Sequence, residues 1–78
     1  MKVDEIRKML HNEPFRHFVI VVADGGRIPV LHEDFVAVAP TGREMIVYQP
    51  DGSYNVVDTM LVTRLEVEAT DGRRKTRK

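Results

Sequence analysis

The segment DGG at 24–26 lies between two apolar runs, and glycine loops can hold phosphate groups through their backbone N–H donors. A phosphate loop needs the spacing G-x-x-x-x-G-K followed by Ser or Thr, or G-x-G-x-x-G opening onto a helix. The segment has neither spacing, and the residues after it, RIPV, are typical of a strand. Asp-Gly is a strong hairpin signal, because glycine adopts positive φ at no steric cost. We therefore predict a hairpin turn at 24–26, and similar turns at 41–42 and 51–52.

The histidines that could bind a metal ion or transfer protons are His11, His17 and His32. No H-x-x-x-H or H-E-x-x-H spacing is present, so the sequence contains no local metal site. The run HED at 32–34 leaves two interpretations open. It could supply metal ligands or a general acid/base pair, or it could be a polar loop. In the loop, Asp34 would bond to the nearby backbone before Phe35 enters the core.

Covalent catalysis would need an activated nucleophile, and the sequence offers few candidates. There is no cysteine, which also excludes disulfides and thiolate metal sites. The single serine, Ser53, follows Asp51-Gly52 in a predicted turn, and no G-x-S-x-G motif surrounds it. We therefore predict a protein that is not an enzyme and needs no cofactor.

The aromatic side chains could stack nucleic-acid bases or fill the core. The three phenylalanines lie beside apolar neighbours, which favours the core. Tyr48 and Tyr54 flank the QPDGS turn, so we expect them to be exposed and available for base stacking.

The last eight residues, DGRRKTRK, form a basic segment that contains Arg73, Arg74, Lys75, Arg77 and Lys78. A terminal charge run is usually a disordered, solubilising tail. The alternative is a basic arm that contacts RNA, DNA or an acidic protein, with binding that weakens as salt rises.

Charge and length limit the class of protein. Residues 1–70 hold seven Lys/Arg and eleven Asp/Glu, a net charge of −4, whereas 71–78 carry +4. An acidic body argues against a broad nucleic-acid-binding face. The 78 residues are enough for one domain with a thin core, expected at 1–70. FVIVVA at 18–23 is too short to span a bilayer, and the N-terminus resembles no signal peptide, so we expect a cytoplasmic protein.

One helix and five or six strands are predicted from the pattern of apolar residues. Val3, Ile6, Met9 and Leu10 form one apolar stripe, which predicts a helix over 3–12. Short runs rich in β-branched residues, separated by turn signals, predict strands at 18–23, 27–31, 35–39, 44–49, 54–57 and 62–67. A single helical turn at 58–61 is expected before the last strand.

So many short strands in so small a chain favour a closed sheet. The predicted fold class is mainly β with one N-terminal helix: a small barrel with the helix over one open end. Pro29 cannot donate to a ladder, so it marks an edge, bend or bulge of the second strand.

Two resemblances extend this prediction. Residues 3–68 resemble a group of short, uncharacterised bacterial proteins in the segments EPFRHFVI, ADGGRIPVLHEDFVAV, PTGREMIVYQPDGS and VVDTMLVTRLEV. No activity is established for that group. The order of VDEIRKMLHN, FVIVVADGGRIPV, EMIVYQ and VVDTMLVTRLEV also resembles the Sm-like (Hfq-type) proteins. That resemblance implies a five-stranded Sm-like or SH3-like bent barrel whose last strands pair between subunits.

The sequence differs from the Sm-like pattern at the positions that bind RNA in Hfq-type proteins. Hfq-type proteins carry a Lys-His pair before the last strand, where this chain has Asp58 and Thr59, and an acid there repels phosphate. We therefore predict a non-enzymatic interaction module that self-associates as a ring or dimer. RNA binding by the tail and the barrel rim is the alternative. The expected oligomer edge consists of Val62, Arg64, Leu65 and Val67.

Overall fold

The computed structural model describes residues 1–68 as one helix, six strands and two short 3₁₀ turns. The predicted basic contacts of the C-terminal segment lie outside the described residues: Arg73, Arg74, Lys75, Arg77 and Lys78.

Helix α1 (Val3–Leu10) is amphipathic as predicted and buries Ile6 and Leu10. It ends two residues before the predicted boundary at 12. The backbone N–H of His11 still donates to Arg7 O at 3.0 Å, but His11 has left helical geometry. Asn12 N donates to Met9 O, three residues back, at 3.5 Å, which is the tighter bonding common at helix ends. Sequence patterns place such ends only approximately.

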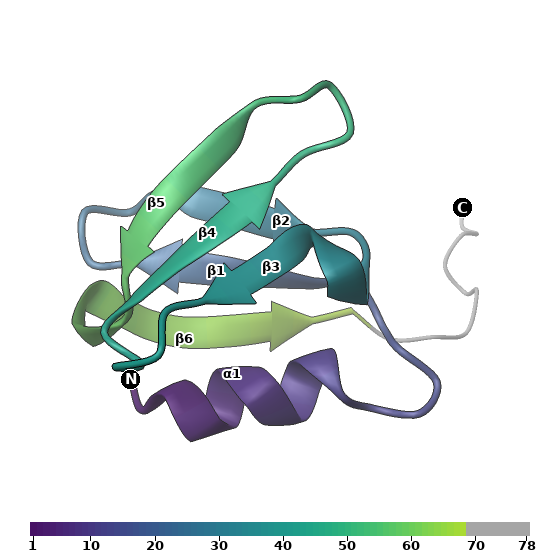
Figure 1. The fold of residues 1–78 in the computed structure, drawn as a ribbon, viewed down its shortest axis with the longest axis horizontal. Helices are drawn as coiled ribbons and strands as arrows, with labels where there is room; N and C mark the ends of the chain where they lie inside the picture. Colours follow the sequence, from purple (N-terminus) through teal and green to yellow (C-terminus); the bar gives the residue numbers. More distant parts are fainter. Residues whose placement is uncertain (69–78) are drawn as a thin grey trace.

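The six strands form two antiparallel three-stranded sheets, in the orders β2-β1-β6 and β3-β4-β5 (Figure 1). Their bounds are β1 Phe18–Val22, β2 Arg27–Val30, β3 Val36–Val38, β4 Glu44–Tyr48, β5 Tyr54–Asp58 and β6 Val62–Val67. The mainly β class with an N-terminal helix is thus present, but the five-stranded closed barrel is not confirmed for residues 1–68. Helix α1 contributes Ile6 and Leu10 to the core that it shares with both sheets.

A 3₁₀ turn, η1 (Glu33–Phe35), explains part of the difference between the predicted closed barrel and the two observed sheets. The predicted strand over 35–39 loses its first residue to the turn, and β2 and β3 belong to separate sheets. Pro29 lies on β2, an edge strand, as predicted. Its carbonyl accepts a hydrogen bond from the Gln49 side chain at 2.9 Å.

The predicted glycine turns are confirmed, and two of them share one geometry. In the β1–β2 hairpin, Gly25 N donates to Val22 O at 2.9 Å, Val22 N donates to Gly26 O at 3.0 Å, and Gly25 has φ +91°. The Asp24 carboxylate accepts from Gly26 N at 2.8 Å. The β4–β5 hairpin repeats these bonds over 49–53. A three-residue hairpin loop with glycine at positive φ is a common solution for such short connections.

The predicted helical turn before the last strand is confirmed as η2 (Thr59–Leu61). Asp58 caps it by accepting from Met60 N at 2.9 Å. The turn joins both sheets, because Thr59 N donates to Arg43 O at 3.0 Å and Ala23 N donates to Leu61 O at 2.8 Å.

The core lies between the two sheets and α1. Its buried residues are Ile6, Leu10, Phe18, Ile20, Val30, Met45, Val47, Val57 and Val62. Of the three phenylalanines only Phe18 is fully buried. Phe35 was expected to enter the core but is half-buried. It belongs to η1, and the centroid of its ring lies 5.5 Å from that of His32.

The turn at Gly42 packs directly on α1, which gives a testable difference between two glycines. Both Gly25 and Gly42 have positive φ, so alanine at either position costs about 1–2 kcal/mol of backbone strain. A Cβ at Gly25 would meet nothing within 4 Å, whereas one at Gly42 would approach Val3 Cγ1 at 3.0 Å. We expect Gly42→Ala to lower the free energy of unfolding by about 1 kcal/mol more than Gly25→Ala. Equal losses in urea denaturation would contradict this packing.

Candidate functional site

The histidine-containing run at 32–34 forms a capped turn. His32 Nδ1 accepts a hydrogen bond from Asp34 N at 3.1 Å, so the imidazole caps η1, where the Asp34 carboxylate was expected to bond to the backbone. The Asp34 carboxylate lies 3.8 Å from the same nitrogen. No group of three His, Cys, Asp or Glu side chains within residues 1–68 is placed to hold a metal ion. His11 and His17 are exposed elsewhere.

Ser53 holds the β4–β5 turn together. Its hydroxyl donates to Asp51 Oδ1 at 2.6 Å, and its backbone N–H donates to the same oxygen at 2.9 Å. The Ser53 hydroxyl and then its backbone N–H lower the pKa of Asp51, because both bonds favour the charged carboxylate. This arrangement organises a turn, with the hydroxyl proton directed to a carboxylate that is kept ionised.

Strand β6 is the terminal strand of its sheet, with β1 as its hydrogen-bonded neighbour. Of the four residues expected at an oligomer edge, Val62 is only 3% exposed and belongs to the core, and Leu65 packs against that core. Arg64 is exposed and bound to Glu66, while Val67 is 38% exposed. A neighbouring chain at this edge would therefore meet mainly backbone groups and Val67.

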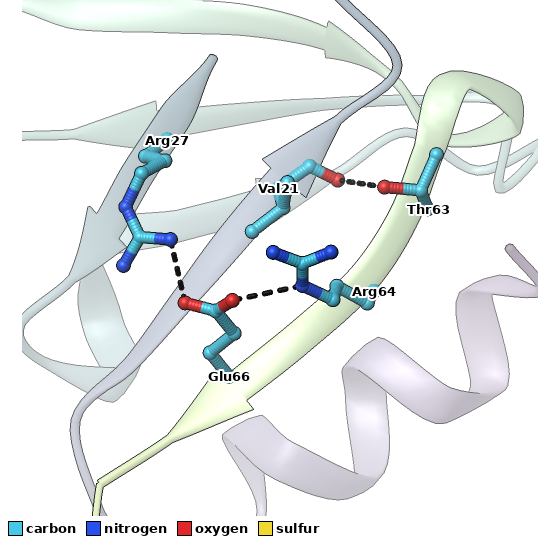
Figure 2. Close-up of polar contacts among 5 residues, drawn as sticks. All are labelled: Val21, Arg27, Thr63, Arg64 and Glu66. Atoms are coloured by element: carbon cyan, nitrogen blue, oxygen red, sulfur yellow. Dashed lines mark hydrogen bonds and ion pairs between the residues drawn. The ribbon is translucent and has the colours of Figure 1, made fainter. Parts of the chain in front are cut away.

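Charged side chains gather around Val21 on the outer face of the β2-β1-β6 sheet (Figure 2). Glu66 binds Arg64 Nε at 2.8 Å and Arg27 Nη1 at 2.6 Å. Val21 lies in register with both arginines and is buried. Hydrogen bonds from Arg64 and then Arg27 lower the pKa of Glu66. The three charged side chains thus satisfy one another and shield Val21 on this face.

Glu66→Gln is expected to lower stability near neutral pH and to have no effect in acid. The pKa of Glu66 is lower in the folded protein than its ordinary value of 4.5, so the ion pairs stabilise the fold fully above that value. The contribution is lost as the pH falls through the lowered pKa, because the protonated Glu66 side chain is then as uncharged as the glutamine amide of the variant. Urea denaturation of both proteins across this range measures the difference. A difference that persists in acid would contradict the ion-pair explanation.

The outer face of the β3-β4-β5 sheet has a different character, because most of its side chains are apolar and several of them are exposed. Cross-strand register places Ala37, Ile46 and Val56 in one row and Tyr48 opposite Tyr54 in another. We call these five residues the outer apolar face. Val56 is 65% exposed and Tyr54 is 59% exposed. Tyr48 is 42% exposed, so the expected exposure of both tyrosines at the hairpin is confirmed. The centroids of their rings lie 5.6 Å apart.

The sequence contains a signal for this face that the strand predictions did not use. A strand with one wet face alternates apolar and polar residues, whereas MIVY at 45–48 is continuously apolar. In the structure Met45 and Val47 point into the core, and Ile46 and Tyr48 lie on the outer apolar face. A run of this kind is typical of a strand that is covered on both sides.

The electrostatic surroundings of this face are acidic. Residues 44–58 contain no lysine or arginine and three acids, a net charge of −3. Glu44 and Asp58 are directly opposite each other, and like charges in that position repel. A nucleic-acid platform needs cations near its aromatic rings to bind the phosphates, and this segment supplies none.

Comparisons of the chain with protein-family models, curated proteins and solved structures found no match. Within residues 1–68 no helix is long and apolar enough to cross a membrane. The most distinctive part of the candidate site is the outer apolar face.

Proposed function

We propose that the protein is a non-enzymatic interaction module that self-associates by packing the outer apolar face of one copy against that of another. The observation that carries this proposal is the β3-β4-β5 sheet itself. Its inner face fills the core. Its outer face carries the half-buried Ile46 and exposes Tyr48, Tyr54 and Val56. Tyrosine and large aliphatic side chains are the groups that anchor protein interfaces.

A two-fold arrangement suits the charges around this face. The acids Glu44 and Asp58 lie at one end of the β4–β5 pair, and the two tyrosines lie at the other end. A two-fold axis parallel to the row formed by Ala37, Ile46 and Val56 would place the acidic end of one copy over the tyrosine end of its partner. Four carboxylates would then remain apart, which avoids like-charge repulsion across the interface.

The finer fold assignment, an Sm-like or SH3-like barrel, belongs to the same proposal. It is supported by the order of the elements: an N-terminal helix, short antiparallel strands, and the 3₁₀ turn η2 before the last strand. In this assignment β6 contributes its free backbone edge to a neighbour, with Val67 as the exposed apolar contact.

Sedimentation equilibrium tests self-association and the RNA alternative together. At micromolar concentration, the protein should have at least twice its chain mass of 9.0 kDa, and a short RNA should leave that mass unchanged. A strict monomer would contradict the proposal. A mass that rises only with RNA, and falls again with salt or when residues 71–78 are deleted, would favour nucleic-acid binding by the basic segment.

A further inference from the structure

A cavity of about 310 Å³ lies between the β1–β2 hairpin and strand β5. Its wall is mainly aliphatic, and two aspartates stand at its rim. The lining residues are Val22, Ala23, Asp24, Ile28, Asn55, Val56, Val57, Asp58 and Leu61. The hydrogen bond from Ala23 N to Leu61 O closes the cavity beside η2. We call this cavity the β5 groove.

The β5 groove borders an unpaired strand edge. Strand β5 has β4 as its one hydrogen-bonded neighbour within residues 1–68. The turn bond from Gln49 N to Ser53 O sets the alternation of the ladder. Asn55 and Val57 therefore direct their backbone groups to β4, whereas Tyr54 and Val56 direct theirs to the free side. A strand laid along this side would find backbone donors and acceptors already in line.

The two rim carboxylates are fixed in position and form no ion pair within residues 1–68. Asp24 Oδ1 accepts from Gly26 N, and Asp58 Oδ1 accepts from Met60 N, so both side chains are held in their turns. Neither forms an ion pair with another residue of the described chain. An aliphatic groove with two anionic groups at its rim is complementary to an occupant that is apolar in the middle and cationic outside.

We propose that the β5 groove binds an extended segment of a partner protein in which apolar and basic residues alternate. The segment adds to β5 as an antiparallel strand. Because side chains alternate across a strand, its apolar residues enter the groove beside Ile28 and Leu61. Its basic residues lie on the other side, near Asp58 and the rim. This inference goes beyond self-association, because the groove is complete within one chain and uses the edge of the sheet.

The probe is an eight-residue peptide of alternating valine and lysine, acetylated and amidated, titrated at low salt and followed by backbone amide shifts. Saturable shifts should centre on Tyr54, Val56 and Leu61. A valine–glutamate peptide should bind at least about tenfold more weakly, because it meets two carboxylates with like charge. Equal binding of both peptides, or the absence of saturable binding, would overturn the proposal.

Two N-methylated peptides test strand addition itself. In an antiparallel pair, residues directly opposite share a face, so the peptide residues that bond to Val56 are the lysines. Methylating the lysine backbone nitrogens should abolish binding, and methylating those of the valines should leave it intact. If both methylated peptides bind equally, or both fail, no strand has been added to β5 and the proposal is wrong.

Matched variants locate the site. Asp24→Asn together with Asp58→Asn keeps a side-chain oxygen for each turn bond but removes the charge, and should weaken binding by about fivefold. Leu61→Ser should weaken binding, whereas Met60→Ser, on the same turn but outside the groove, should not. Equal effects of the two serine variants would overturn the assignment. The mass of the protein in solution, measured on the same samples, shows whether the copies still self-associate when peptide binding is weakened.

Discussion

Ile6→Ala is expected to remove about 2–5 kcal/mol from the free energy of unfolding, the usual cost of truncating a buried isoleucine. Ile6 is fully buried and carries the apolar stripe of α1 into the core shared by both sheets. An isolated helix of eight residues is unstable in water, so α1 depends on this docking. A domain of this size has a total stability of about 4–12 kcal/mol, so the loss is a large fraction of it.

Urea denaturation measures the effect, with Lys8→Ala as the control on the same helix. Lys8 is exposed, and its ion pair with Glu5 spans 3.6 Å at the surface, so its removal should change stability by less than about 0.5 kcal/mol. If Ile6→Ala costs no more than Lys8→Ala, then α1 does not contribute to the core.

Ile46→Lys is expected to abolish self-association while the chain stays folded. Ile46 lies at the centre of the outer apolar face, between Ala37 and Val56. A charged ammonium at a desolvated interface centre costs about 2–4 kcal/mol, which corresponds to a dissociation constant at least about 30-fold higher. In the monomer the side chain points away from the core, so the lysine can reach solvent.

Met60→Lys is the control for this variant, because Met60 is an exposed apolar residue on η2, outside the outer apolar face. Size-exclusion chromatography with light scattering should give a monomer for Ile46→Lys and the wild-type mass for Met60→Lys. Assembly of both variants would place the interface elsewhere. Urea denaturation of Ile46→Lys is compared with that of the wild type at a concentration where both are monomeric. A cooperative transition of the variant confirms that its chain is folded.

Most elements could be predicted because their signals are local. The apolar stripe from Val3 to Leu10 identifies α1, and the Asp-Gly pairs place two of the hairpins. The turn η2 was also expected before the last strand, and in the structure the adjacent Asp58 caps it. These features depend on residues close in sequence, so composition and spacing are sufficient.

The arrangement of the sheets could not be predicted, because it depends on pairing between distant strands. Whether short strands close into one barrel depends on the position of η1 and on the partner chosen by each edge. The cluster of Glu66 with Arg27 and Arg64 likewise requires the register of three strands. For the candidate site, the exposure of Tyr48 and Tyr54 was expected. The sequence signal for the outer apolar face was the unbroken apolar run MIVY at 45–48.

Hydroxyl-radical footprinting tests most directly whether the outer apolar face is an interface between copies. Ile46, Tyr48 and Tyr54 should be labelled in dilute protein and protected at concentrations where the mass doubles, while exposed Met60 reacts equally in both samples. Equal labelling of the tyrosines and Ile46 at both concentrations would contradict the proposed interface.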